Sequence, residues 1–94
     1  MIVDQLQPEI AGSAVILGEV HVGAGAILAQ GLVARSHGAT VSIGNYSAIW
    51  ENGVVIGTRT HPVRVGQRTV FGHRATIVGA TIGDLCATLR RVQR

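Results

Sequence analysis

The side chains that could do chemistry in this 94-residue chain are four histidines, five carboxylates, eight arginines and a single cysteine, Cys86. A neutral imidazole can bind a metal ion or act as a general base, and a guanidinium group can hold a phosphate or a carboxylate. The sequence contains no lysine, which excludes Schiff-base chemistry and the lysine of a phosphate-binding loop. The candidates for catalysis or binding are therefore His37, His61, His73, Glu51 and the arginines around them.

Charge is divided unevenly along the sequence. Residues 1–34 contain three acidic residues and no basic one, a net charge of −3, whereas residues 35–94 contain eight arginines and two acidic residues, a net charge of +6. An arginine-rich segment can bind nucleic acid, but no recognition helix, aromatic stacking platform or finger pattern accompanies this charge. We therefore expect no nucleic-acid partner.

Composition predicts one small folded domain that spans residues 1–94. Hydrophobic residues make up 47% of the chain and charged residues 14%, which is too apolar for a disordered protein. The longest aliphatic runs are a handful of residues, well short of the roughly 20 needed to cross a bilayer, so no membrane partner is expected. A lone cysteine and the absence of a signal-peptide pattern at the first residues predict a cytoplasmic protein.

A six-residue repeat predicts the elements that position these side chains. One slot recurs in three runs: Ile10, Ile16, Val22, Leu28 and Ala34; Ile43, Ile49 and Val55; and Val65, Phe71 and Ile77. A second apolar or small position follows each slot by four residues, from Ala14 to Gly38 in the first run. A three-residue slip separates the first two runs, and a longer interruption around His61 separates the last two.

A spacing of six is a multiple of the strand period of two, so the slot and the position four residues later point to the same side of an extended chain. Thirteen glycines and a core rich in valine and isoleucine argue against helices. The pattern predicts an all-β solenoid in which three short rungs make one coil and stacked coils share a core. The tail after Asp84 is either a short basic helical cap or a truncated coil.

The repeat resembles that of the hexapeptide-repeat left-handed β-helix family over about residues 8–89, which implies a left-handed parallel β-helix of about four coils. Two segments are similar to γ-class carbonic anhydrases. Residues 35–44, RSHGATVSIG, are similar to the family segment that begins with Arg-Gly-Asp and ends with Ile-Gly. Residues 65–84 are similar to the segment that contains Gly-His, Leu-His-Gly-Cys and Ile-Gly-Asp. The chain is thus identified as γ-carbonic-anhydrase-like.

This resemblance implies a zinc ion held by three histidines across a trimer interface, with water at the open fourth position. His73 falls on one ligand of the family, whereas Val78 stands where the second is expected and Gly57 where the third is expected. Trp50 replaces the family's glutamine, and Glu51 keeps an acid at its position. We expect an incomplete zinc site, weak or absent CO2 hydration, and a structural or binding role.

Two interpretations of the histidines remain open. In one, His37, His61 and His73 converge at a subunit boundary and rebuild a metal site. In the other, His73 is a remnant ligand or an interface residue, and the other histidines are solvated. Arg35 falls on the family's arginine, which implies a bond to an acid of a neighbouring subunit. An outward Trp50 also indicates a subunit contact, so a homotrimer is expected.

The alternative function is that of a hexapeptide-repeat acyltransferase that uses acyl-CoA. Arg64 lies near His61, and Arg68 and Arg74 are six residues apart, which predicts a basic strip on successive rungs. Such a strip could hold the phosphates of acyl-CoA while His61 or His73 deprotonates an acceptor. The competing interpretation is that these arginines form a solvated or interface-pairing face.

Overall fold

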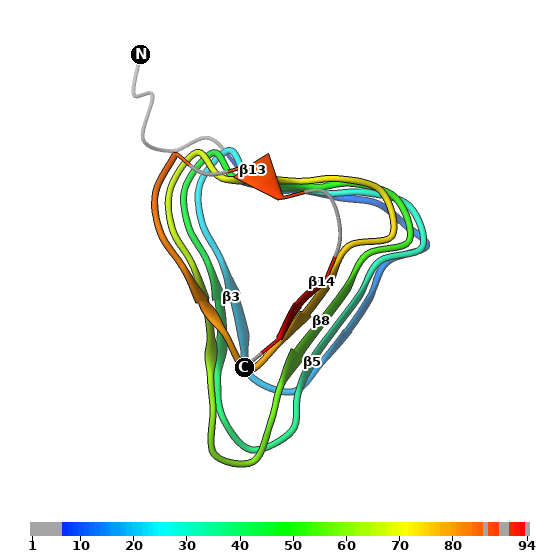
Figure 1. Ribbon diagram of the computed structural model, residues 1–94. Helices are drawn as coiled ribbons and strands as arrows, with labels where there is room; N and C mark the ends of the chain where they lie inside the picture. Colours follow the sequence, from blue (N-terminus) through cyan, green and yellow to red (C-terminus); the bar gives the residue numbers. More distant parts are fainter. Residues whose placement is uncertain (1–6, 86, 89–90, 94) are drawn as a thin grey trace.

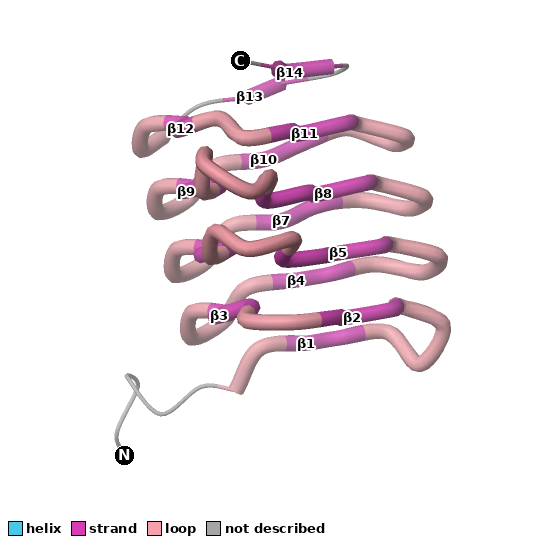
Figure 2. Tube along the Cα trace, turned by 90° about the horizontal axis from the view of Figure 1, so that it is seen from below, coloured by secondary structure: helices cyan, strands magenta, loops and turns pink. Residues whose placement is uncertain are grey.

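The computed structural model describes residues 7–85, 87–88 and 91–93, and Cys86 lies outside them. The chain winds into a three-sided column (Figure 1), and its coils stack along the column axis (Figure 2). From the N-terminus onward the chain turns clockwise in Figure 1 while it advances toward the viewer, so the coil is left-handed. The strands are β1 (Glu9–Ile10), β2 (Val15–Leu17), β3 (Val20–Val22), β4 (Ile27–Leu28), β5 (Val33–Ser36), β6 (Val41–Ile43), β7 (Ala48–Ile49), β8 (Val54–Gly57), β9 (Val63–Val65), β10 (Val70–Phe71), β11 (Thr76–Val78), β12 (Thr81–Ile82), β13 (Ala87–Thr88) and β14 (Arg91–Gln93).

The strands form three parallel sheets, one on each side of the column. Sheet A has the order β1-β4-β7-β10-β13, sheet B the order β14-β11-β8-β5-β2, and sheet C the order β12-β9-β6-β3. In sheet A, Glu9 pairs with Ile27, Ile27 with Ala48, and Ala48 with Val70. The coils therefore contain 18, 21 and 22 residues, and the extra residues are the two phase breaks of the sequence repeat. The predicted fold of about four stacked coils is confirmed.

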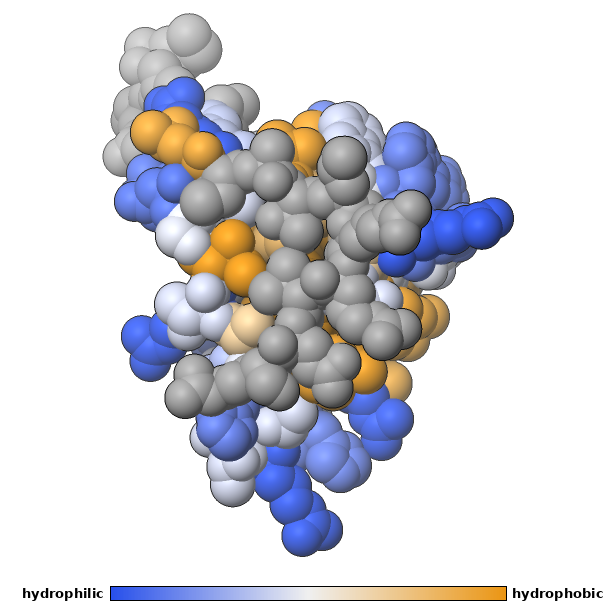
Figure 3. Space-filling view, viewed as in Figure 1, coloured by the Kyte–Doolittle hydropathy of each residue, from blue (hydrophilic) through white to orange (hydrophobic). Residues whose placement is uncertain are grey.

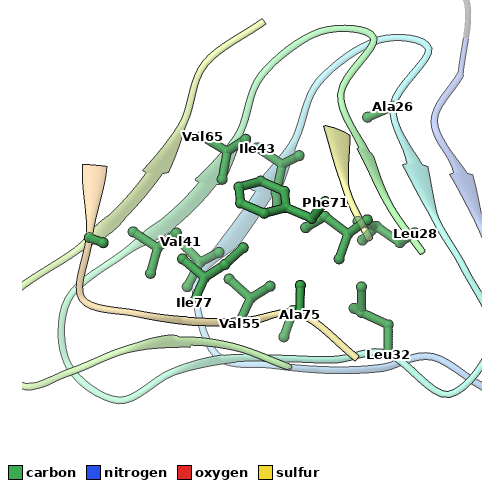
Figure 4. Packing of buried hydrophobic residues seen from close by; sticks show 14 residues of the cluster. Ala26, Leu28, Leu32, Val41, Ile43, Val55, Val65, Phe71, Ala75 and Ile77 are labelled. Carbon is green, nitrogen blue, oxygen red and sulfur yellow. The ribbon is translucent and has the colours of Figure 1, made fainter. Parts of the chain in front are cut away.

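The repeat slots fill the inside of the column. Residues alternate along each strand, as in β8, where Val55 is fully buried and its neighbours Val54 and Ile56 are half-buried. Ile49, Phe71 and Ile77 are also fully buried, and Figure 4 shows such side chains packed together from all three sides. Because no single coil can enclose these side chains, the core is shared between neighbouring coils.

The second position of each rung is more varied than the slot. At the corner between sheets C and A it holds Ser47 and Thr69, both fully buried. The hydroxyl of Thr69 donates to the carbonyl of Gly83 at 2.7 Å, and the hydroxyl of Ser47 donates to that of Gly66. Gly38, predicted as such an inward position, is instead exposed, with φ of +117°, because the first phase break carries the chain outside the triangle.

Both phase breaks are loops at the corner between sheets B and C, at the bottom of Figure 1. Residues 37–40 follow β5, and residues 58–62 follow β8 one coil later. The amide of His37 donates to the carbonyl of Gly57 at 2.7 Å, and the amide of Ala39 donates to that of Thr58 at 2.9 Å. The two loops are therefore stacked like the strands that precede them.

The tail does not form a helical cap in the part that the structure describes. Residues 87–88 pair with β10 and residues 91–93 pair with β11, both in parallel. The open edges of those two strands offer the tail backbone hydrogen bonds, so it continues as the truncated coil. No helix among the described residues is long and apolar enough to cross a lipid bilayer.

Candidate functional site

Trp50, Glu51 and His73 meet at the corner between sheets A and B. The amide of Trp50 donates to the carbonyl of Phe71 at 3.2 Å, and the amide of Arg74 donates to that of Glu51 at 2.9 Å. Parallel stacking therefore places the turn after β7 directly beneath the turn after β10. The rings of Trp50 and His73 lie 6.4 Å apart between centroids and are inclined by 23°, which is a stacked arrangement.

His73 also contacts the carboxylate of Glu51. Its Nδ1 lies 2.7 Å from Oε1 of Glu51, an ion pair when the imidazole is protonated. The N–H direction is not aligned with that oxygen, so Oε1 is buried without a hydrogen-bond partner among the described residues. The His73 side chain is 71% exposed and that of Glu51 is 42% exposed. This pair supplies one imidazole and one carboxylate, which suffices for proton transfer but not for a closed zinc site.

The two other positions that the family resemblance assigns to ligands lie at the far end of sheet B. Gly57 ends β8 and Val78 ends β11 in the next coil. His73 precedes sheet B, and four to five residues of extended chain separate it from Val78, roughly 15 Å. A Cβ atom on Gly57 would lie 2.5 Å from the carbonyl oxygen of Ala39 and 3.2 Å from that of Thr40. The loop of residues 37–40 thus occupies the space that a side chain at position 57 requires.

His61 and His37 lie at this same far corner, in the two stacked loops. The amide of His61 donates to the hydroxyl of Thr58 at 3.0 Å, and its Nδ1 lies 2.8 Å from the hydroxyl of Thr60. Its Cβ is 2.9 Å from where a Cβ on Gly79 would be, so His61 packs beside the end of β11. His61 and His37 therefore share one corner, whereas His73 occupies another.

Within the described part of one subunit, no three histidine, cysteine, aspartate or glutamate side chains are close enough to hold a metal ion. A single subunit therefore does not assemble the site that was considered for His37, His61 and His73. Their joint participation in a metal site at a subunit boundary stays a prediction.

The arginines of the acyl-CoA hypothesis do not line one strip. Arg64 points outward from the middle of β9 in sheet C. Arg68 lies at the next corner, over the ring of Tyr46 at 5.1 Å from its centroid. Arg74 lies at the corner after sheet A, because successive rungs face different sides of the triangle. The cavity beside Arg68 measures about 180 Å3, which is below the usual range for small-molecule sites, so these positions give the acyltransferase alternative no support.

Arg35 lies on the outer face of sheet B, which is otherwise largely apolar. Val15 and Leu17 are 45% and 50% exposed there, and Val33, Val54, Ile56 and Val78 are half-buried. Orange side chains on the right-hand side of the column in Figure 3 belong to this region. Arg35 is exposed, and no ion pair is found for it among the described residues. Its predicted partner on a neighbouring subunit remains untested.

A groove that sequence reasoning missed adjoins Glu51. It measures about 430 Å3 and is lined in part by Glu9, Ile27, Ala29 and Gln30. These residues come from three coils, and only the register of the coils brings them together. The unequal coil lengths hide that register from the six-residue pattern, so the sequence carries no signal for the groove.

Comparisons with known proteins agree on one class. The chain is 34% identical over 81 residues to gamma carbonic anhydrase 1, mitochondrial, of Arabidopsis thaliana, which covers 80% of this chain and 30% of the relative. It is 31% identical over 81 residues to gamma carbonic anhydrase 3, mitochondrial, of the same plant, with 80% and 31% covered. It is 36% identical over 75 residues to a probable carbonic anhydrase of Methanocaldococcus jannaschii, with 80% and 47% covered.

The chain thus spans between about a third and a half of the length of these relatives. No family model and no solved structure matches the chain. The similarity nevertheless covers most of the coils described above, including the turn that carries His73. The left-handed column and these relatives together show that the chain is a γ-carbonic-anhydrase-like hexapeptide-repeat β-helix protein.

Proposed function

We propose that this chain has an incomplete zinc site, hydrates CO2 weakly or not at all, and serves a structural or binding role as a homotrimer. The observation that carries the proposal is the packing at Gly57. The position that would supply an imidazole is filled by the carbonyl groups of Ala39 and Thr40. Val78, at the other position, has no lone pair to donate and is held in β11 by pairing with Ile56.

Zinc hydrolytic centres use three protein ligands and keep one position for water. Of the three positions that the family would use, only His73 carries an imidazole here. The residues at the other two positions do not fit a zinc ion. His73 stacks on Trp50 and contacts Glu51, which supports a structural role for it.

The outer face of sheet B supports the trimer. Apolar side chains on a parallel sheet are normally covered, because parallel sheets are usually buried on both faces. In the column the inner side of sheet B is covered by the core and its outer side is open. A second and a third copy would cover this face, with Arg35 at the contact.

The test measures zinc content and CO2 hydration on protein prepared without chelators. We expect substoichiometric zinc and a hydration rate close to that of the uncatalysed reaction. His73→Ala should change neither quantity, since one imidazole alone does not retain zinc. His21→Ala is the matched control, because His21 contacts only Glu19 at 3.3 Å on sheet C.

Stoichiometric zinc together with robust turnover would contradict the proposal. If His37→Ala, His61→Ala and His73→Ala each then removed the zinc while His21→Ala did not, the rebuilt site at a subunit boundary would be established instead. A hydration rate that survives in all four variants would point to contamination by another carbonic anhydrase, which a second purification step removes.

A further inference from the structure

The groove beside Glu51 runs along the outer side of sheet A. Its volume of about 430 Å3 lies within the range of small-molecule sites. Glu9 in β1 and Ile27 in β4 pair with each other and form its floor, and Ala29, Gln30 and Glu51 bring it to the corner with sheet B. None of these residues belongs to the positions at which the family would hold zinc.

The charge of the groove is negative. Glu9 and Glu51 both line it, and none of its lining residues is basic. The first 34 residues, which build its lower part, contain no basic residue. Oε1 of Glu51 is a buried carboxylate oxygen that lacks a hydrogen-bond partner among the described residues. A cationic donor would satisfy that oxygen and would be attracted to both carboxylates.

The spacing of the two carboxylates selects the kind of cation. Glu9 lies in the first coil and Glu51 two coils above it, which separates them by roughly 10 Å of stacked strands. A metal ion needs its oxygen ligands within about 2.6 Å, so the pair does not chelate one ion. Ile27 and Ala29 lie in the coil between them and present apolar surface.

We propose that this groove binds a linear aliphatic diammonium ion. One ammonium group pairs with Glu9, the other with Glu51, and the methylene chain lies over Ile27 and Ala29. Each end exchanges water for a carboxylate, and the middle removes apolar surface from water. This site goes beyond the proposed function and does not depend on zinc or on trimer formation.

The test is a titration of the chain with hexamethylenediamine, whose extended length is comparable to the two-coil separation. Backbone amide shifts of Ile27, Ala29 and Gln30 report binding in the groove, and fluorescence of Trp50, the single tryptophan, gives a second readout. We expect hexylamine to bind about fivefold more weakly and hexanediol more weakly again, since a partly exposed ion pair contributes about that factor. Added salt should weaken the diamine but not hexanediol.

Three variants assign the ends. Glu9→Gln should lower diamine affinity to that of hexylamine, and Glu51→Gln should weaken both amines. Glu19→Gln is the matched control, because Glu19 also lies in the first coil but contacts His21 rather than the groove. Equal binding of the three compounds, equal losses in Glu19→Gln, or an absence of saturable shifts in folded protein would overturn the proposal.

Discussion

The outer faces of sheets B and C differ although their backbones are alike. Both sheets are parallel ladders of short strands, and both send every second residue into the same core. On sheet C the outward residues in the middle of the strands are His21, Ser42, Arg64 and Thr81. On sheet B the outward residues are mainly Val, Leu and Ile.

This difference separates what the fold requires from what an interaction requires. The core requires only the inward residues, and a polar outer face on sheet C satisfies that requirement. The outward valines, leucine and isoleucine of sheet B add nothing to the core of one subunit. An apolar face of this kind marks a contact surface.

The largest effects should come from the interior, where the two sheets are equivalent. Ile77→Ala in sheet B and Ile43→Ala in sheet C should each lower the free energy of unfolding by about 2–5 kcal/mol, because each leaves a cavity in a shared core. Chemical denaturation of both variants measures this. A loss confined to one of the two would show that the sheets do not share one core.

An intermediate effect is expected on the outer faces. Ile56→Arg places a charge on the apolar face of sheet B, and Ser42→Arg places the same side chain on sheet C at a position that is also half-buried. Ile56→Arg should raise the concentration at which the trimer dissociates by about a hundredfold, from lost apolar burial and an unpaired charge. Light scattering coupled to size exclusion measures the assembly. Dissociation caused equally by Ser42→Arg would end the distinction between the faces.

The smallest effect concerns the end of sheet B, where the loop of residues 37–40 lies against β8. Gly57→Ala should lower the free energy of unfolding by about 1–3 kcal/mol, because its Cβ meets backbone oxygens that must move. Gly12→Ala is the control, since a Cβ at Gly12 would meet nothing within 4 Å. Thermal unfolding compares the two. Equal stability of both variants would mean that the loop yields freely and that position 57 is open to larger side chains.

The six-residue pattern predicted the column well because burial imposes it. Slot residues such as Ile49 and Phe71 are large and inward, and no other arrangement of a two-residue period buries them all. The pattern was wrong at Gly38, whose small size suits an inward position and equally suits the exposed loop that it occupies. Composition alone does not separate these two uses of glycine.

The candidate site was less predictable because it depends on which corner a residue reaches. His73 and Glu51 are 22 residues apart and in contact, whereas His61 and His73 are closer in sequence and lie at different corners. Inserted loops of different lengths set this register. Arg68 and Arg74 show the same effect, since equal rung positions face different sides of a triangle.

The close approach of Ala39 to Gly57 also restricts the order in which substitutions can accumulate. A histidine at position 57 is disfavoured until the loop after β5 has been shortened or displaced, while a histidine at position 78 meets no comparable obstacle. Any return toward a three-imidazole centre would therefore have to begin with the backbone of one loop and only afterwards exchange side chains.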